Sequence, residues 1–268
     1  MRGAPTLRSR YFVPPPPAVY GGADGETTYT GYNYLGRGPV AWVKLRHFEA
    51  ALEYARPWFG TANVVDFGCA DGAFLPSLAH HFPRVRAIDV DPGFARGAQR
   101  VVEELRLANT RVICNAERSM QSLADELRPD GCELLFLLET LEHVGDANRL
   151  HPSKIDFLTE LFSLLADDGQ IVISVPTMVG LPFLFQRAVL GGLRMTREPI
   201  SGPDLLRAVV LRNTDRLEPQ WLPHKHLGFN HRKLESHLRR HFSMLHRQSL
   251  VFTELFVIAR HGASRSIG

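Results

Sequence analysis

The sequence predicts an α/β protein with a doubly wound, mostly parallel sheet that has helices on both faces. The first observation behind this prediction is an apolar strand that runs into a glycine turn and then into a helix, over residues 64–74. The second is the alternation of β-branched apolar segments with helical patterns along the next hundred residues. Such alternation is typical of parallel sheets with helical crossovers.

The predicted elements follow in chain order. A leading helix is expected over residues 42–58, where apolar side chains recur at helical spacing before and around Pro57. Strands are expected over residues 63–67, 85–90, 110–115, 133–138 and 170–175, with helices over 72–81, 93–107, 119–127 and 152–165. Gly169 suits the turn before the fifth strand. A basic helix over 232–240 and strands over 242–245 and 250–258 end the chain.

Changes in composition divide the chain into four segments. Residues 1–38 form a proline- and tyrosine-rich arm, expected to be draped on the domain or disordered, with its tyrosines as candidates for covering a ligand cleft. Residues 39–176 form the core. Residues 177–223 form an apolar, lid-like insertion, and residues 224–268 supply the C-terminal helix and strands.

The composition is that of a globular protein. Of 268 residues, 44% are hydrophobic and 22% charged, and a net charge of +3 is too small to indicate nucleic-acid binding by itself. The three cysteines show no Cys-x-x-Cys spacing, which argues against a disulfide framework or a zinc knuckle. We find neither a leader-like start nor a segment of membrane-spanning length. We therefore expect a soluble, cytoplasmic protein.

The glycine turn from Gly68 to Gly72 indicates the chemistry of its ligand. Two glycines four residues apart let the backbone approach a ligand closely. A dinucleotide site would instead carry Gly-x-Gly-x-x-Gly and bind a pyrophosphate at the helix N-terminus. Here Asp66 precedes the turn and Asp71 lies inside it, and carboxylates repel phosphate. Both carboxylates suit a ligand that lacks phosphate and carries positive charge.

The pattern Asp66-x-Gly68-x-x-x-Gly72 resembles the first motif of the class I S-adenosylmethionine-dependent methyltransferases, with Ala70 where that family usually has glycine. The run Leu-Glu-Thr-Leu-Glu-His-Val over residues 138–144 resembles the branch that includes the ubiquinone-pathway O-methyltransferases. The match extends over residues 64–176. The resemblance implies a Rossmann-like methyltransferase fold, whose seven-stranded sheet the last two strands complete, and S-adenosylmethionine as cofactor.

Residues at the expected strand ends are candidates for holding this cofactor. Asp89 can accept both ribose hydroxyls in charge-assisted bonds, whereas Asp91 before Pro92 is better placed to cap the next helix. Asn115 lies where the family places a polar residue on the adenine amino group, and a turn-forming role would explain this asparagine too. The predicted cofactor-binding set is Asp66, Gly68, Cys69, Ala70, Gly72, Asp89, Val90, Asn115, Ala116 and Glu139.

Glu142 and His143, which follow the fourth expected strand, are the predicted catalytic residues. A neutral imidazole accepts protons near pH 7, so we expect His143 to act as general base and Glu142 to hold or polarise it. Small-RNA 2′-O-methyltransferases share this signature, and there the equivalent residues bind a divalent metal. A metal here would use Glu139, Glu142 and His143 with His224 or His226. We favour the interpretation without a metal.

The favoured function is therefore methylation, most simply of an oxygen on a small-molecule or lipid-like acceptor, with the apolar insertion as a lid. RNA 2′-O-methylation with a divalent metal is an alternative that the Glu-x-x-Glu-His set and the basic tail favour, but the modest net charge and the apolar insertion argue against nucleic acid as partner. A methyltransferase-like protein that binds cofactor without turnover is another alternative. The basic tail is expected to be a solvated helix face, or else a surface for peripheral membrane contact through anionic headgroups. No particular oligomeric state is indicated.

Overall fold

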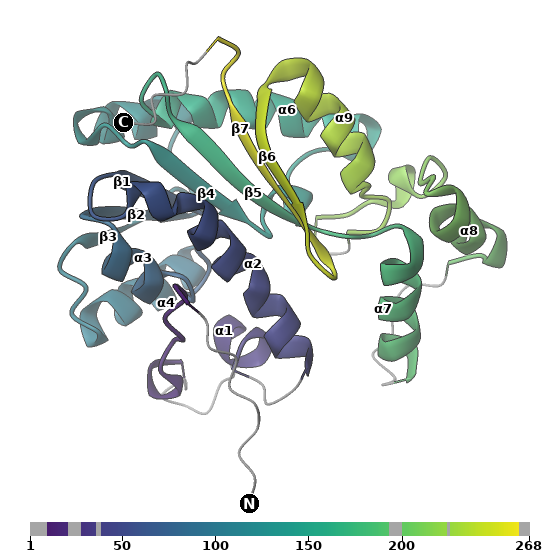
Figure 1. Cartoon of the computed structure of the whole chain (residues 1–268), viewed down its shortest axis with the longest axis horizontal. Coiled ribbons are helices and arrows are strands. Elements are labelled where there is room, and N and C mark those ends of the chain that lie inside the picture. The colour runs from purple at the N-terminus through teal and green to yellow at the C-terminus, as the bar shows by residue number, and fades with distance from the viewer. Residues whose placement is uncertain (1–9, 21–27, 36–38, 193–199, 224–225, 263–268) are drawn as a thin grey trace, which may run out of the picture. The chain divides into compact units, whose positions relative to one another are not determined.

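The structure is a computed structural model that describes residues 10–20, 28–35, 39–192, 200–223 and 226–262. Its strands are β1 (Asn63–Phe67), β2 (Arg84–Asp89), β3 (Thr110–Cys114), β4 (Leu134–Leu138), β5 (Gln170–Pro176), β6 (Ser243–Ser249) and β7 (Thr253–Ala259). They pair in the order β3-β2-β1-β4-β5-β7-β6 (Figure 1). All seven expected strands are present, β1 at its expected bounds and the others with ends that differ by up to four residues.

The direction of pairing changes along the sheet. β1 pairs in parallel with β2 and β4, and β2 pairs in parallel with β3. β6 and β7 pair antiparallel, with a register shift between Met244 and His246. The predicted α/β class and Rossmann-like fold are confirmed, but the sheet is mixed, because a short turn between its last two strands reverses the chain.

The chain forms two compact units, which are described separately. Unit 1 comprises the chain up to Leu138 and residues 163–172, and unit 2 comprises residues 139–162 and 173–268. Unit 1 contains the helices α1 (Tyr29–Asn33), α2 (Pro39–Ala55), α3 (Leu75–His81), α4 (Pro92–Glu104) and α5 (Met120–Leu127). Unit 2 contains α6 (Leu150–Leu161), α7 (Gly180–Gly192), α8 (Gly202–Leu206) and α9 (His231–His241).

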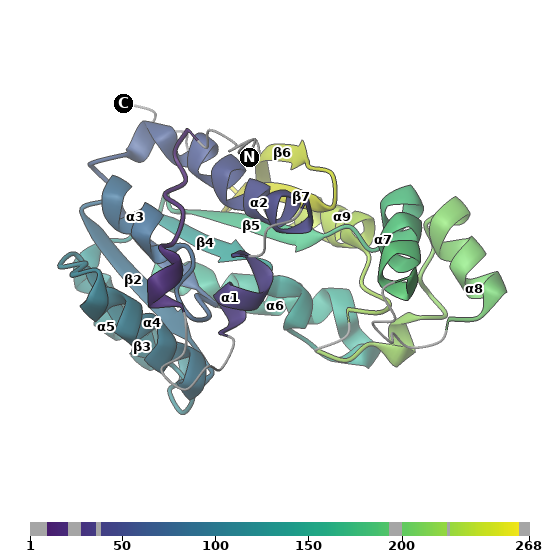
Figure 2. The same cartoon turned by 90° about the horizontal axis from the view of Figure 1, so that it is seen from below.

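The core of unit 1 surrounds strands that are apolar along their whole length. Every side chain of β4 is buried, as expected for a strand covered on both faces. α4 contacts α3 and runs beside β2 and β3 (Figure 2). The ring of Phe74 stacks on Phe48 of α2 at 4.8 Å and meets Phe136 of β4 edge-on at 5.4 Å. Since Phe74 lies two residues after Gly72, these rings fix the glycine turn to the core.

The described part of the N-terminal arm is hydrogen-bonded to the helices of its own unit, unit 1. The Glu49 carboxylate on α2 accepts a hydrogen bond from the Phe12 backbone N at 2.7 Å, and the Ser77 hydroxyl accepts one from the Val13 N at 2.9 Å. The Phe12 ring stacks on Phe48 at 5.3 Å. These residues are therefore draped on the domain, which was one of the two expectations.

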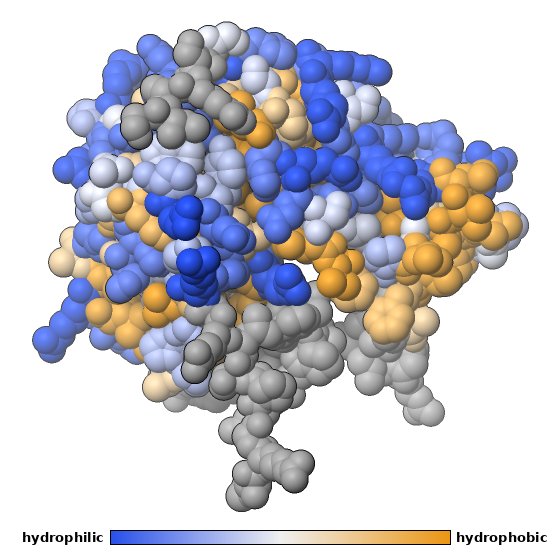
Figure 3. All heavy atoms as spheres, viewed as in Figure 1, coloured by the Kyte–Doolittle hydropathy of each residue, from blue (hydrophilic) through white to orange (hydrophobic). Residues whose placement is uncertain are grey.

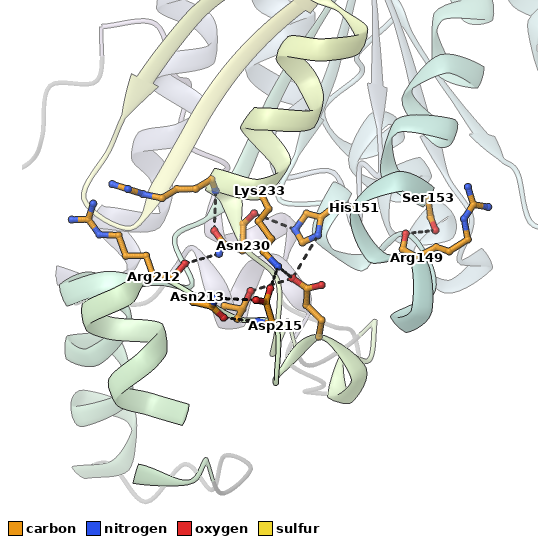
Figure 4. A network of polar contacts seen from close by, with 11 residues as sticks. Arg149, His151, Ser153, Arg212, Asn213, Asp215, Asn230 and Lys233 are labelled. Carbon is orange, nitrogen blue, oxygen red and sulfur yellow. Dashed lines mark hydrogen bonds and ion pairs between the residues drawn. The ribbon is translucent and has the colours of Figure 1, made fainter. Parts of the chain in front are cut away.

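In unit 2, α9 packs against α6 and β6 (Figure 1). A polar network joins α9 to the segment that precedes it (Figure 4): Lys233 forms ion pairs with Asp215 and Glu218. Arg247 on β6 pairs with Glu254 on β7 at 3.4 Å. Lys233 and Arg247 of the basic tail are thus paired with acidic residues of the same unit, while both side chains stay partly exposed.

The described residues of the apolar insertion contain two α-helices, α7 and α8. α7 and α8 both contact a π-helical turn, Arg207–Leu211, which continues directly from α8. Large apolar side chains are left exposed on these elements: Leu181, Leu184, Phe185, Leu206, Val210 and Leu211. Figure 3 shows hydrophobic surface gathered over α7 and α8. In the part of the chain that the structure describes, no helix combines the length and the apolar character needed to cross a bilayer.

Candidate functional site

The turn between β1 and α3 has a backbone conformation that suits small residues. Gly68, Ala70 and Gly72 have φ angles of 78°, 47° and 88°, all in the left-handed region. A Cβ on Gly72 would lie 3.0 Å from Leu75 Cδ1 and 3.3 Å from the Cα of Ala98, so α4 packs directly against this glycine. The backbone therefore requires glycine at position 72, and Ala70 carries strain that glycine would avoid.

Asp89 ends β2 and holds the glycine turn through its carboxylate. Its Oδ2 accepts a hydrogen bond from Ala70 N at 2.9 Å, and its Oδ1 accepts one from Asp91 N at 2.9 Å. Burial raises the pKa of Asp89, and the backbone hydrogen bonds oppose this. Each oxygen keeps a lone pair for a further donor. Asp91 caps α4 by accepting from Gly93 N and Phe94 N, as the sequence predicted.

Two buried side-chain oxygens at the ends of β1 and β3 can accept hydrogen bonds from a ligand. Asn115 N donates to the Asp89 carbonyl at 2.8 Å, but Asn115 Oδ1 and Asp66 Oδ2 have no hydrogen-bond partner among the described residues. Burial raises the pKa of Asp66 to about 7, with a smaller contribution from the Asp89 charge. Val90 is apolar yet 57% exposed. These pairings bring together the strand ends that carry the expected residues Asp66, Gly68, Cys69, Ala70, Gly72, Asp89, Val90, Asn115 and Ala116.

Asp71 is hydrogen-bonded by the N-terminal arm. Its buried carboxylate accepts hydrogen bonds from Thr30 N at 2.8 Å and from the Thr30 hydroxyl, so the arm occupies it. The Tyr20 hydroxyl donates to the Gly72 carbonyl at 2.9 Å. Each oxygen accepts one hydrogen bond and keeps a lone pair, so the expected role of Asp71 toward a cationic ligand stays a prediction. Sequence reasoning missed Thr30, because a contact between residues 41 positions apart leaves no local pattern.

Glu139 leaves β4 with a φ of 49° and is held by β5. Its backbone N donates to the Ser174 carbonyl at 3.0 Å, and its Oε1 accepts from the Ser174 hydroxyl at 3.0 Å. Ser174 was not identified from the sequence, because a serine inside an apolar strand pattern has no distinguishing spacing. The carboxylate of Glu139 is thus engaged within unit 2.

Glu142 lies in the short 3₁₀ helix Leu141–His143 and is 1% exposed. Neither of its carboxylate oxygens has a hydrogen-bond partner in the described ranges. Burial, and secondarily the charge of Glu139, raises the pKa of Glu142 well above its usual value. Leaving a buried carboxylate without hydrogen bonds is costly, so the protonated form of Glu142 is favoured over the ionised one.

His143 has two ring nitrogens in different environments. Nδ1 is hydrogen-bonded to the Pro223 carbonyl. A carbonyl oxygen only accepts, so Nδ1 carries the proton and Nε2 is the bare nitrogen of the neutral ring. Nε2 lies 3.9 Å from Glu142 Oε1. Burial lowers the pKa of His143, with the Pro223 bond opposing it, so the imidazole is neutral near pH 7.

The ring of His226 lies 4.4 Å from that of His143, at 81°. One potential ligand atom each of Glu142, His143 and His226 lies within 4.8 Å of the others, a spacing that could hold a metal ion. Of the other expected metal ligands, Glu139 is not part of this group, and His224 lies outside the described residues.

Lys154 on α6 was also missed by sequence reasoning. It is fully buried, and burial lowers its pKa to about 7, with the charge of Glu142 opposing the shift. Its Nζ donates to the Leu141 carbonyl at 3.0 Å. The available signal was its spacing, since Lys154 lies four residues from both Leu150 and Leu158 and so falls on the apolar stripe of the helix.

Comparisons with known proteins match this chain to methyltransferases. A sequence profile described as a methyltransferase domain matches residues 39–250. An uncharacterized methyltransferase of Mycobacterium tuberculosis is 40% identical over 58 residues, which cover 22% of this chain and 29% of that protein. The ubiquinone biosynthesis O-methyltransferase of Xanthomonas euvesicatoria is 30% identical over 156 residues, 58% of this chain and 57% of that protein. The chain thus matches less than two thirds of the length of either relative.

Among solved structures, the magnesium protoporphyrin IX methyltransferase of Synechocystis with bound SAH aligns with a TM-score of 0.53. The alignment covers 91% of each chain at 14% sequence identity. At that identity the likeness concerns the fold alone.

Proposed function

The chain belongs to the methyltransferase-domain family, and from that premise we propose that it transfers a methyl group from S-adenosylmethionine to an oxygen of a small-molecule or lipid-like acceptor. The observation that carries the oxygen assignment is His143, whose Nε2 is bare and whose pKa is lowered. A neutral imidazole can take the proton that a hydroxyl loses on methylation. The name of the ubiquinone biosynthesis O-methyltransferase, a 30% identical relative, points the same way.

The residues of unit 1 fit S-adenosylmethionine, which supplies an activated methyl group when bound. The unpartnered Asp66 Oδ2 suits the positive charge of its sulfonium or ammonium group. The Asp89 carboxylate keeps acceptor capacity for the two ribose hydroxyls. Asn115 Oδ1 can accept from the adenine amino group, and the exposed Val90 offers an apolar face to the base.

His143 performs the proton step in this proposal. Its Nε2 accepts the hydroxyl proton, and the Pro223 carbonyl holds the proton on Nδ1 and stabilises the imidazolium that forms. The Glu142 carboxyl group, whose Oε1 lies 3.9 Å from Nε2, can form an ion pair with that imidazolium. Positioning of the reactants can supply ~7–11 kcal/mol of the barrier reduction, so one base is sufficient beside a well-formed site.

The direct test is transfer of label from methyl-labelled S-adenosylmethionine to small-molecule and lipid extracts, followed by identification of the methylated atom. Label found on an oxygen of one acceptor class supports the proposal. Cofactor binding without transfer to any extract or to RNA would favour a non-catalytic binding protein, and label on nitrogen or carbon would contradict the O-directed assignment.

Affinity for S-adenosylmethionine is expected to rise as the pH increases through about 7. Asp66, with a pKa of about 7, is protonated below this pH and ionised above it, and the ionised form attracts a cation. Calorimetric titrations between about pH 6 and about pH 8 should show the dissociation constant falling several-fold. In Asp66→Asn this pH dependence should vanish, and an unchanged dependence would exclude Asp66 from the cofactor site.

The exposed apolar side chains of the insertion are proposed to contact the acceptor. Replacing Phe185 and Leu211 with serine should raise KM for a lipid-like acceptor on the order of tenfold, because burying one large apolar side chain is worth about 1.5–3 kcal/mol. Cofactor affinity should not change. Val251→Ser is the matched control, since Val251 is 51% exposed and lies outside the insertion. Equal KM values in all variants would show that the insertion does not contact the acceptor.

RNA 2′-O-methylation with a divalent metal is the second candidate, favoured by the grouping of Glu142, His143 and His226. These residues fit a cation, because the Glu142 oxygens lack hydrogen-bond partners in the described part of the chain and His143 Nε2 is bare. A metal ion held there would act as a Lewis acid. The engaged cations of Lys233 and Arg247 disfavour RNA as the acceptor. Transfer of label to short RNA alone would favour this candidate.

A further inference from the structure

The tautomer of His143 depends on how residues 141–144 orient its ring toward the Pro223 carbonyl. We propose that Lys154 is a positioning residue that holds residues 141–144 so that His143 keeps Nδ1 on the Pro223 carbonyl and leaves Nε2 bare. The inference deepens and rests on the proposed function of His143, but its structural part can be tested without turnover.

The ammonium group of Lys154 is matched completely by one loop. Its Nζ donates to the carbonyls of Leu141 at 3.0 Å and Glu142 at 3.4 Å, and also to that of Val144. An ammonium has three N–H donors, so each finds an acceptor. The Leu141 carbonyl also accepts from the Val144 backbone N at 3.2 Å, which closes the 3₁₀ turn. Lys154 therefore adds a second donor to this turn and binds the carbonyls that follow it at Glu142 and Val144.

The same ammonium group also lies against the segment that holds the His143 ring. The ring centroids of Trp221 and Phe229 are 5.0 Å and 5.5 Å from Nζ. Trp221 Nε1 donates to the Glu142 carbonyl at 3.2 Å, and Pro223, two residues later, accepts from His143. Lys154 thus lies where residues 221–223 and residues 141–144 are joined, so its loss would loosen both sides of the His143 contact.

Packing alone does not explain a lysine at this position. Lys154 is 0% exposed and lies on the buried stripe of α6 with Leu150, Leu158 and Leu161. A methionine of similar length would fill this space without taking a charge out of water. Burying an ammonium group is costly unless its hydrogens are matched. The carbonyls that it binds are therefore the feature that accounts for the lysine.

The first test is nitrogen-15 NMR of the His143 ring in the whole chain, assigned with His143→Gln. The wild-type protein should show one neutral tautomer with the proton on Nδ1, and Lys154→Met should show a mixture with the Nε2-protonated form. Lys233→Met is the control, because Lys233 lies in the same unit but pairs with Asp215 and Glu218. An unchanged tautomer in Lys154→Met would overturn the inference.

The second test separates positioning from a general loss of structure. Lys154→Met should lower kcat by ~10–100-fold while the S-adenosylmethionine dissociation constant changes less than about threefold. In a His143→Ala background the same substitution should cause little further loss, since residues that act through one group are not additive. Losses that multiply in the double variant would mean that Lys154 acts on stability rather than through His143.

Trp221→Phe covers the case in which Lys154→Met does not fold. It removes the donor to the Glu142 carbonyl and keeps an aromatic ring, so it should shift the tautomer in the same direction with a loss in kcat of about three- to tenfold. A wild-type tautomer in Trp221→Phe would overturn the inference. If the wild-type protein transfers no methyl group, the proposed function fails, whereas the tautomer measurements still decide whether Lys154 positions His143.

Discussion

Replacing His143 with alanine is expected to lower turnover by ~10²–10⁴-fold and to leave S-adenosylmethionine affinity nearly unchanged. The loss would follow from removal of Nε2, the unprotonated nitrogen that we propose takes the acceptor proton. The residues proposed to bind the cofactor, Asp66 and Asp89, belong to unit 1, and the hydrogen bonds of Asp89 do not involve this ring. Steady-state kinetics with labelled cofactor, combined with calorimetry, measures both quantities. His241→Ala, at the exposed end of α9, is the matched histidine control.

A chelator distinguishes the two roles of the imidazole. If His143 is a general base, the wild-type enzyme should be indifferent to chelation, and His226→Ala should cost far less than His143→Ala. If Glu142, His143 and His226 hold a cation, chelation should abolish activity and added Mg²⁺ or Mn²⁺ should restore it. A His143→Ala enzyme of normal rate that is also insensitive to chelator would exclude both roles and leave positioning as the catalytic device.

Asp89→Ala is expected to weaken S-adenosylmethionine binding by about tenfold or more, because each charge-assisted hydrogen bond to a ribose hydroxyl contributes ~1.5–3 kcal/mol. The substitution also removes the acceptor of Ala70 N, so the glycine turn loses its anchor on β2. Asp89→Asn retains one acceptor oxygen, so its affinity for S-adenosylmethionine should lie between those of the wild-type protein and Asp89→Ala. Calorimetry of the purified variants gives the dissociation constants.

Asp91→Ala is the matched carboxylate control for that measurement. Asp91 caps α4 and is exposed, so its loss should cost about 0.5–2 kcal/mol of stability while cofactor affinity stays within about threefold. Equal affinities for the wild-type protein and Asp89→Ala would remove Asp89 from the site. A drop of the same size in both variants would mean that affinity follows the stability of α4 rather than a ribose contact.

The elements that the sequence predicted well are those whose determinants are local. β1 was predicted at its observed bounds because its apolar run ends at the glycine turn. Asp91 was predicted to cap α4 because an aspartate directly before a proline is typical of a helix N-terminus. Boundaries were less accurate where the backbone departs from regular structure. α3 begins at Leu75 rather than at Gly72, because the left-handed φ of Gly72 is incompatible with a helix.

The parts of the site that could not be predicted depend on contacts between distant residues. The occupation of Asp71 by Thr30 cannot be inferred from either sequence neighbourhood. The pairing of Lys233 with Asp215 and Glu218 likewise turns an apparently basic surface into an internal network. The sequence contained the charges in both cases, but only the fold determines which of them are left for a ligand.

The hydrogen bonds from the arm to the glycine turn have a practical consequence for handling the protein. Tyr20 and Thr30 are bonded to Gly72 and Asp71, whereas every strand of the sheet lies after residue 62. A preparation trimmed to start at residue 39 would keep all strands and lose these bonds. Its circular dichroism spectrum would look folded, and weak cofactor binding would then reflect the trimming and not a missing site. Binding measurements are therefore informative on protein that retains its first 38 residues.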